Sequence, residues 1–407
     1  MKILVLNSGS SSQKSALFEL DPKSSVEPIP PLWEGKLDWD GNQEVLSIQD
    51  SAGKRIHTES EIASVARQAS VENLLRNLWN GPAAVLESAS EIHFVGHRIV
   101  HGGPKLTQPA IITSEVTQAI ADVSAIAPLH NQAGLEGIAL IEKLLPSIPQ
   151  VAVFDTGFHR SLPAAAKTYA GPYDWYERGI RRFGFHGINH EYCANRTAQL
   201  LGRDLEQLKI ISCHLGNGCS LAAIDSGKSV DTTMGFTPLE GLMMGTRAGS
   251  IDPGILTHLL RTKYASEGDL DETLNRKSGL LGISGISSDM RDILKAMRNG
   301  NERAKLAFDI FVHRLCSEIG AMAASLGGLD VLVFTAGIGE NSAEVRAAAC
   351  TQLKFLGVEV DTAKNAAVRP DERISLSGSK VEVLVIRAQE DWAIARECLR
   401  ISEQRRS

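Results

Sequence analysis

A strand–turn–strand pattern that occurs twice, half a chain length apart, restricts the fold more than any other feature. The segments KILVLNSG (2–9) and KIISCHLG (209–216) share a lysine, two apolar residues, a polar residue at the sixth place and a glycine at the eighth. Each is followed by a second apolar segment, SALFEL in the first case and CSLAAID in the second. A repeat of this kind predicts two duplicated lobes with a ligand-binding cleft between them.

Apolar segments of strand length alternate with segments of helical spacing along the rest of the chain. VAVFDTGFH (151–159) is a short apolar strand that ends on an acid, which is typical of a buried central strand. Helical patterns occur at 60–80 and 292–327, and further strands at 331–341 and 381–388. Strands that alternate with helices predict an α/β fold.

The length of 407 residues agrees with this division, because a single core rarely extends over so long a chain. We predict an N-terminal lobe at 1–150 and a second, nucleotide-binding lobe at 151–387. The C-terminal helix at 388–407 is expected to pack back on the first lobe.

The composition argues against several classes of partner. A formal net charge of -6 provides no basic surface on which nucleic acid would bind. No apolar run reaches the roughly 18 residues of a membrane span, and the apolar start is too short for a secretory signal. The six cysteines form no CxxC pair, which favours reduced thiols over a disulfide framework. We therefore predict a cytoplasmic protein with no nucleic-acid or membrane partner.

Four glycine-rich turns each adjoin an apolar segment. They are NSGSSSQK (7–14), HLGNGCS (214–220), SGISSDMRD (284–292) and TAGIGEN (335–341). Glycine allows the backbone to approach a ligand closely, and successive N–H groups then form an anion-binding nest. One such turn is more often structural than functional, but four of them, two at equivalent places of the repeat, indicate a nucleotide held between the lobes.

Two pairs of histidines stand four residues apart, a spacing that metal ligands use on helices: His97 with His101, and His186 with His190. The first pair lies in a predicted strand, where residues four apart are roughly 13 Å from each other. We therefore expect no zinc site.

Two arginines and two acids stand out by their surroundings. Arg98 lies within the apolar segment VGHRIVHGG, and Arg247 lies between glycines in GLMMGTRAGS. Each either forms a salt bridge with an acid or binds an anionic ligand through two parallel hydrogen bonds. Asp155 and Glu390 each come just after a predicted buried strand, where a carboxylate can hold Mg²⁺.

Taken together, these motifs resemble the successive signatures of the acetate kinase family, in the family's order and over nearly the whole chain. The matching segments are NSGSSSQK, GHRIVHGG, PLHN, FDTGFH, RRFGFHG, HLGNGCS, TPLEGLMMGTRAGSIDP, SSDMRD and TAGIGEN. The resemblance implies the two-lobed fold of the actin, Hsp70 and sugar-kinase superfamily, with an RNase H-like core in each lobe. It also implies a homodimer that makes acyl phosphate reversibly from ATP and a short carboxylic acid such as acetate.

The resemblance also implies a role for each residue at a matching position. Asn7 and Glu390 would hold Mg²⁺, with Mn²⁺ as the alternative ion, and Arg98 would hold the substrate carboxylate. The catalytic residues would be Asp155, His186 and Arg247. The apolar pocket for the acetate methyl group would consist of Val100, Leu129, Phe185 and Pro238. ATP or ADP would be bound by Lys14, His214, Leu215, Gly216, Asn217, Gly218, Asp289, Met290, Arg291, Gly337, Ile338, Gly339, Glu340 and Asn341.

Elementary acid–base chemistry agrees with most of these roles and questions one. A carboxylic acid has a pKa like that of a glutamate side chain, so the nucleophile is already ionised at pH 7 and needs no base. The chemistry instead requires positive charge and hydrogen-bond donors that bring two anions together for direct in-line attack. We therefore expect Asp155 to orient a metal or an arginine rather than to move a proton.

The sequence departs from the usual family pattern at a few places. Gln389 stands where asparagine usually precedes the acid pair, which leaves the choice of Glu390 over Asp391 as metal ligand open. Gly157 replaces a common alanine on the expected substrate side.

Three alternative functions stay open at this point. A kinase of the same family could prefer propionate or butyrate, because one methylene changes binding by only about 1–3 kcal/mol. A nucleotide-gated binding protein of the actin or Hsp70 type would use the same fold without small-acid chemistry. A sugar kinase would need a carboxylate base, for which Asp155 would serve.

Overall fold

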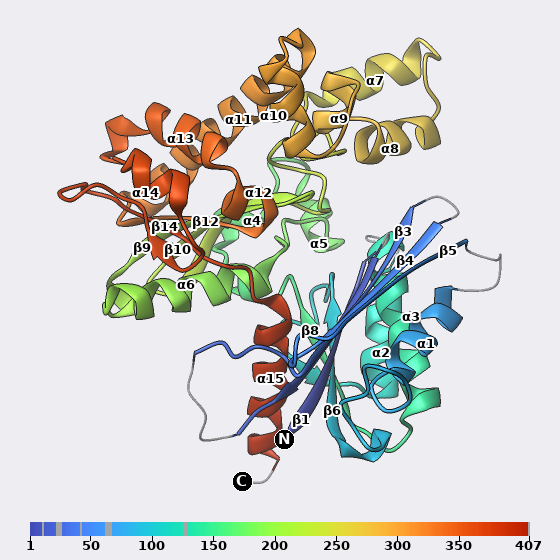
Figure 1. Ribbon diagram of the computed structural model, residues 1–407. Helices are drawn as coiled ribbons and strands as arrows, with labels where there is room; N and C mark the ends of the chain where they lie inside the picture. The colour runs from blue at the N-terminus through green and yellow to red at the C-terminus, as the bar shows by residue number, and fades with distance from the viewer. Residues whose placement is uncertain (10–11, 22–26, 41–42, 62–66, 125–127, 406–407) are drawn as a thin grey trace. The chain divides into compact units, whose positions relative to one another are not determined.

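The computed structural model of the 407-residue chain describes residues 1–9, 12–21, 27–40, 43–61, 67–124 and 128–405 (Figure 1). The chain forms two compact units. The first comprises Met1–Gly157 with Gln389–Ser407, and the second comprises Phe158–Ala388. The first unit extends past residue 150, where the sequence pattern placed its end, because the strand that begins there pairs within the first sheet.

The first unit is built on an eight-stranded sheet with the strand order β5-β4-β3-β2-β1-β6-β8-β7. Its strands are β1 (Lys2–Ser8), β2 (Ser12–Glu19), β3 (Trp33–Asp40), β4 (Gln43–Asp50), β5 (Arg55–Glu61), β6 (Ile92–Ile99), β7 (Ala110–Ile111) and β8 (Gln150–Phe154). Strands β1 to β5 form antiparallel pairs, whereas β6 runs parallel to β1 and β8 parallel to β6. Parallel neighbours need a crossover, which α2 (Ser114–Asp122) and α3 (Pro128–Leu144) supply between β6 and β8.

One face of this sheet packs against α1 (Arg67–Arg76) and α3 over an apolar core. Trp33 of β3, Leu74 of α1 and Leu140 of α3 are buried together there. The sequence predicted a helix at 60–80, and α1 occupies the described part of that range; residues 62–66 lie outside the described residues. A short 3₁₀ turn, Ala89–Glu91, precedes β6.

The other face of the same sheet is covered by α15 (Glu390–Gln404), which contacts β1, β2, β6 and β8 (Figure 1). Gly96 of β6 allows this close approach, because a Cβ atom there would lie 2.6 Å from Cγ2 of Ile394 and 2.8 Å from Sγ of Cys398. The first turn of α15, with Glu390 and Asp391, thereby reaches the end of β1.

The second unit is built on a six-stranded sheet with the order β11-β10-β9-β12-β14-β13. Its strands are β9 (Lys209–Leu215), β10 (Cys219–Asp225), β11 (Lys228–Thr232), β12 (Val331–Thr335), β13 (Glu372–Arg373) and β14 (Glu382–Val385). Strands β9, β10 and β11 form an antiparallel meander, and β12 and β14 continue the sheet in parallel beyond β9. The same order and directions occur for β1, β2, β3, β6 and β8 in the first unit. The predicted duplicated α/β fold is confirmed.

Helices surround the second sheet, and the longest one, α11, packs against β9, β10 and β11. The helices are α4 (Ala164–Lys167), α5 (Tyr173–Glu177), α6 (Gly187–Leu201), α7 (Pro253–Arg261), α8 (Glu267–Arg276), α9 (Gly279–Ser284), α10 (Met290–Arg298), α11 (Glu302–Leu326), α12 (Ala336–Asn341), α13 (Ala343–Gln352) and α14 (Thr362–Ala367). Three 3₁₀ turns lie at Phe158–Ser161, Leu205–Gln207 and Lys354–Leu356. In the described parts of the chain, no helix has both the length and the apolar character that crossing a membrane requires.

Two elements that the sequence predicted differ in extent from the helices and strands of the structure. The helical run at 292–327 is divided between α10 and α11, because Gly300 adopts a φ of 81° and Asn301 caps the second helix. The strand expected at 331–341 ends at Thr335, and the glycine-rich remainder forms α12. Gly337 and Gly339 therefore lie on a short helix at the end of a buried strand.

Candidate active site

Arg98, near the end of β6, lies in the first unit among acidic side chains. Its Nη2 and Nε donate to Oδ2 of Asp155 at 2.6 and 3.1 Å, and its Nη1 donates to Oδ1 of Asn7 at 3.1 Å. Nε also lies 3.9 Å from Oε2 of Glu390. The carboxyl ends of β1, β6 and β8 bring these residues together, which is where ligand sites form in α/β sheets.

Asn7 connects this cluster to the start of α15. Its Nδ2 donates to Oδ1 of Asp391 at 3.1 Å and to Oε2 of Glu390 at 3.3 Å. Both members of the acid pair therefore contact Asn7. Amide and carboxylate oxygens are the hard ligands that Mg²⁺ prefers. Among the described residues no three His, Cys, Asp or Glu side chains form a metal cage, so an ion here would complete its shell with water and phosphate, as Mg²⁺ commonly does.

Burial controls the ionisation of this cluster. The side chain of Asp155 is 1% exposed, and burial raises its pKa to about 6, while Arg98 opposes the shift by charge and hydrogen bonds. Burial also raises the pKa of Asp391, with the hydrogen bond from Asn7 opposing. The pKa of Arg98 is raised, because the attraction of Asp155 and Glu390 outweighs the effect of burial. The ion pair with Arg98 favours the ionised form of Asp155.

The loop after β6, which carries the predicted pocket residue Val100, is held by a buried asparagine. Oδ1 of Asn131 accepts a hydrogen bond from the backbone N–H of His101, and its Nδ2 donates to the carbonyl oxygen of His101, each at 3.0 Å. Val100 is buried. Leu129 lies on α3, but its side chain is outside the described residues.

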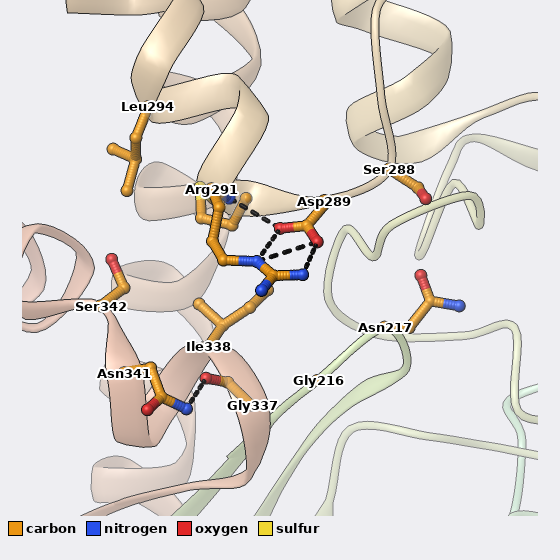
Figure 2. A pocket seen from close by; sticks show the side chains of 11 residues that line it. Gly216, Asn217, Ser288, Asp289, Arg291, Leu294, Gly337, Ile338, Asn341 and Ser342 are labelled. Carbon is orange, nitrogen blue, oxygen red and sulfur yellow. Dashed lines mark hydrogen bonds and ion pairs between the residues drawn. The ribbon is translucent and has the colours of Figure 1, made fainter. Parts of the chain in front are cut away.

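A pocket of about 730 Å³ lies within the second unit (Figure 2). Its wall comes from three of the turns predicted to bind a nucleotide and from residues beside them. The lining residues are Gly216, Asn217, Ser288, Asp289, Met290, Arg291, Leu294, Gly337, Ile338, Asn341 and Ser342. The volume lies within the range of small-molecule sites. The remaining predicted nucleotide-binding residues of these turns lie within two positions of a lining residue along the chain. They are His214, Leu215, Gly218, Gly339 and Glu340.

Asp289 and Arg291 form one side of this pocket at the start of α10. The carboxylate of Asp289 accepts hydrogen bonds from the backbone N–H of Arg291 at 2.8 Å and from its Nη2 at 2.5 Å. These hydrogen bonds lower the pKa of Asp289, although burial opposes them. Figure 2 shows the guanidinium of Arg291 turned toward Asp289 on the pocket wall. The side chain of Arg291 is 88% exposed, so this planar group is available to a nucleotide.

The turn between β9 and β10 lies against two predicted catalytic residues. A Cβ atom added to Gly218 would lie 3.5 Å from Nη1 of Arg247 and 3.5 Å from Nε2 of His186. Both side chains therefore lie against the same glycine, next to Asn217 of the pocket wall. The loop that carries Arg247 is tied to this turn, because the N–H of Gly245 donates to the carbonyl oxygen of Asn217 at 3.0 Å.

Arg247 is half-buried. Its Nη1 donates to the carbonyl oxygen of Pro238 at 3.3 Å. Burial lowers the pKa of Arg247, with the thiol of Cys219 opposing. A cation placed in such a setting interacts strongly with charge that develops on a bound phosphoryl group. Phe185, the other predicted pocket residue of this unit, is 1% exposed.

Two predicted nucleotide-binding residues, Lys14 and Glu340, do not line this pocket and make other contacts. Lys14, on β2 of the first unit, is exposed and lines a separate pocket of about 480 Å³ together with Asp391. Oε1 of Glu340 accepts a hydrogen bond from the backbone N–H of Ala388 at 2.9 Å, and burial raises the pKa of this side chain. Glu340 therefore connects α12 to the segment after β14.

Arg182 contributes to the site in a way that the sequence did not indicate. Its Nη1 donates to the carbonyl oxygens of Thr232, Thr233 and Met234 at 3.0–3.1 Å. Its Nη2 donates to Oε1 of Glu240 at 2.6 Å. One half-buried guanidinium thus holds the loop that leads to Pro238 and Arg247. The motif RRFGFHG contains this arginine, but its partners are far away in the sequence.

We expect Arg182→Ala to lower the free energy of unfolding by about 3 kcal/mol, because Glu240 and the carbonyl oxygens would lose their charged partner. Arg178→Ala is the matched control, since Arg178 pairs with Asp174 at an exposed site and should change stability by under about 1 kcal/mol. Urea denaturation of both variants measures the difference. Equal stability of the two variants would contradict the role given to Arg182.

The family model described as the acetokinase family matches residues 2–396 of this chain. The chain is 56% identical over 398 residues to a protein named acetate kinase from Cyanothece sp., with 98% of each chain covered. It is 55% identical over 401 residues to a protein of the same name from Gloeobacter violaceus, again with 98% of each chain covered.

Solved structures of an acetate kinase and a propionate kinase are also similar to this chain. The crystal structure of Porphyromonas gingivalis acetate kinase matches with a TM-score of 0.89 at 42% identity and covers 98% of this chain and 99% of that one. A propionate kinase from Francisella tularensis matches with a TM-score of 0.88 at 36% identity, covering 97% and 98%. The chain therefore belongs to the acetokinase family.

Proposed function

We propose that this chain is an acetate kinase, which transfers the γ-phosphoryl group of ATP to acetate and gives acetyl phosphate and ADP in a reversible reaction. The observation that carries the proposal is the position of His186 and Arg247 beside Gly218. This glycine belongs to the turn whose Gly216 and Asn217 line the nucleotide-sized pocket. Positive charge and a hydrogen-bond donor thus lie next to the place where the phosphates of a bound nucleotide would be.

The reaction needs charge stabilisation more than proton transfer. A carboxylate oxygen of acetate attacks the γ-phosphorus in line, and the bond from phosphorus to the bridging oxygen breaks, so that its electron pair leaves with ADP. No proton changes place in this step. Arg247 and His186 would stabilise the charge on the equatorial oxygens, and Arg98 would hold the acetate carboxylate. The ion pair of Arg98 with Asp155 supports an orienting role for that acid.

Mg²⁺ belongs to this proposal as the ion that accompanies the nucleotide. Asn7, Glu390 and Asp391 are the residues that would hold it, because both carboxylates contact the side-chain amide of Asn7 and carboxylate and amide oxygens are of the kind that Mg²⁺ takes. When bound, it neutralises phosphate charge. Mn²⁺ prefers similar oxygen ligands and is the alternative ion.

Acetate is favoured over a longer acid by the comparisons. Proteins named acetate kinase reach 56% identity with this chain, whereas the propionate kinase is 36% identical. A binding protein of the actin or Hsp70 type and a sugar kinase are not favoured, because the family match extends over residues 2–396. The homodimer and the cytoplasmic location that the resemblance implies remain part of this proposal, and the molecular mass in solution tests the first.

Hydroxamate formation from ATP, hydroxylamine and either acetate or propionate tests the activity and the preference together. We expect acetyl hydroxamate to form only with both ATP and the acid present, and kcat/KM to be about 10-fold or more higher for acetate. A higher value for propionate would contradict the preference. Absence of hydroxamate with either acid would contradict the function.

A further inference from the structure

His186 and His214 form a stacked pair of imidazoles in the second unit. Their ring centroids are 4.0 Å apart and the ring planes differ by 11°. A Cβ atom on Gly218 would lie 3.5 Å from Nε2 of His186, and one on Gly216 would lie 3.8 Å from Nε2 of His214. Both rings therefore present Nε2 to the same glycine turn.

The opposite edge of each ring is held by a buried polar residue. Nδ2 of Asn189 donates a hydrogen bond to Nδ1 of His214 at 2.9 Å. Nδ1 of His186 is hydrogen-bonded to Oγ of Ser220 at 2.9 Å. Because an amide NH₂ group is only a donor, Nδ1 of His214 must act as an acceptor, and the proton of the neutral ring lies on Nε2.

The contact of His186 continues into the core as a chain of hydrogen bonds. Oγ of Ser220 is also bonded to Nε2 of His190 at 2.8 Å, and Nδ1 of His190 is bonded to Oγ of Ser212 at 2.9 Å. Ser212, Ser220 and His190 are all 0% exposed. Burial lowers the pKa of His190 well below its usual value, so this ring is neutral and has one donor and one acceptor nitrogen.

A serine hydroxyl has one proton and two acceptor lone pairs, so Ser220 either donates to one of the two rings, which gives the chain two directions, or accepts from both, which leaves Nε2 of His186 as an acceptor. In one direction Nε2 of His190 donates to Ser220, Ser220 donates to Nδ1 of His186, and His186 carries its proton on Nε2. In the other direction each donor is reversed, and Nε2 of His186 becomes an acceptor. Next to an anionic phosphoryl group the first direction is favoured, since an acceptor there would repel the phosphate oxygens.

Electrostatic repulsion within the stacked pair also favours neutral rings. Two imidazolium cations with centroids 4.0 Å apart repel each other, and Arg247 lies beside the same turn. Neutral rings that donate through Nε2 avoid this repulsion and still offer hydrogen bonds to phosphate.

We propose that Asn189, His190 and Ser220 are positioning residues that hold His214 and His186 as neutral imidazoles with the proton on Nε2. Both rings then donate to phosphoryl oxygens at the HLGNG turn. The choice of Nε2–H for His186 and the contact with the phosphoryl group rest on the proposed function, whereas the protonation of His214 follows from its bond with Asn189 alone. The spacing of His186, Asn189 and His190 on the first turn of α6 serves this purpose.

Nuclear magnetic resonance of the ¹⁵N-histidine-labelled protein tests the protonation directly. The variants His186→Gln and His214→Gln identify the two rings by loss of their signals. At pH 7 both rings should show the pattern of a neutral imidazole protonated on Nε2. Protonation of His186 on Nδ1, or an imidazolium at either position, would overturn the proposal. The measurement does not depend on catalysis, so it stands even where the wild-type protein forms no acyl phosphate.

The variant Ser220→Ala tests the consequence for catalysis. We expect kcat to fall by about 10-fold to 100-fold, by analogy with the range found when the partner that orients a metal-binding histidine is removed. KM for ATP and acetate should stay within about twofold, and the signals of His186 should change toward a mixture of tautomers. Unchanged kcat together with unchanged His186 signals would overturn the role of Ser220.

A matched control separates this effect from the loss of any buried serine. Oγ of Ser229 is bonded to Nδ1 of His159 at 2.8 Å, and Ser229 is 0% exposed. Ser229→Ala therefore removes the same kind of contact in the same unit from His159, whose ring packs edge-on against His190 but is bonded to Ser229 rather than to Ser220. Its kcat should stay within about twofold of wild type, and its His186 signals should not change. An equal loss of kcat in both serine variants would make the effect one of packing and would contradict the proposal.

Discussion

Replacing Arg247 by alanine is expected to lower kcat for acetyl phosphate formation by about 10³-fold or more, while Kd for ATP stays within about threefold. The reason is the position of this guanidinium beside Gly218 and His186 in a half-buried setting. In the proposed reaction it would act there on charge that is greatest in the transition state. Arg247→Lys should recover little of the rate, because an ammonium lacks the planar fork of donors.

Arg291→Ala is the informative comparison for this prediction. Arg291 lines the same pocket, but it is 88% exposed and pairs with its neighbour Asp289. Its loss should raise KM for ATP and leave kcat within about fivefold, since we expect its contact with the nucleotide to be equal in the ground state and the transition state. Steady-state kinetics and ATP titration of the two variants measure the contrast. A rate for Arg247→Ala within tenfold of wild type would show that the transition state lies elsewhere.

Replacing Arg98 by alanine is expected to abolish acetyl phosphate formation and to lower the free energy of unfolding by about 3–5 kcal/mol. Two effects combine in this variant. The acetate carboxylate loses its proposed partner, and Asp155, whose side chain is 1% exposed, loses the guanidinium that compensates its charge. Hydroxamate formation and urea denaturation measure the two effects separately.

The double variant Arg98→Ala/Asp155→Ala separates stability from catalysis. Removal of both partners leaves no buried unpaired carboxylate at Asp155, so the double variant should be more stable than Arg98→Ala alone. The double variant should remain inactive, because the guanidinium that is proposed to bind the acetate carboxylate is still missing. Recovery of activity together with stability would mean that Arg98 has a purely structural role. Lys2→Ala is the control, since its pairing with Glu91 at the starts of β1 and β6 is partly exposed and should matter little to either measurement.

Arg98 illustrates why the sequence left two interpretations open. Its place in an apolar strand indicated either a salt bridge or an anion site, and the structure gives it a bidentate partner in Asp155. A paired arginine can still bind a carboxylate, because a guanidinium has five N–H donors. The choice of Glu390 over Asp391 also could not be made from residue types, and Asn7 contacts both of them.

Other residues of the site had no signal in the sequence. Ser220 looks like any hydroxyl residue at the start of a strand, and Arg182 like any arginine in a loop. Their roles come from hydrogen bonds to partners that are distant along the chain, such as His190 and Glu240. The pair His186 and His190 had the spacing of metal ligands, yet in the structure a serine hydroxyl lies between them.

The sequence by itself determined the duplicated α/β fold and the turns that form the candidate site. These features are local, since alternation of apolar residues, a glycine and its neighbours specify a strand and its turn without reference to distant segments. The tertiary structure decided which strand completes which sheet, which carboxylates share Asn7, and which nitrogen of each imidazole faces the glycine turn between β9 and β10. Those outcomes depend on non-local strand pairing and on buried hydrogen bonds, whose partners come together only when the sheets are assembled.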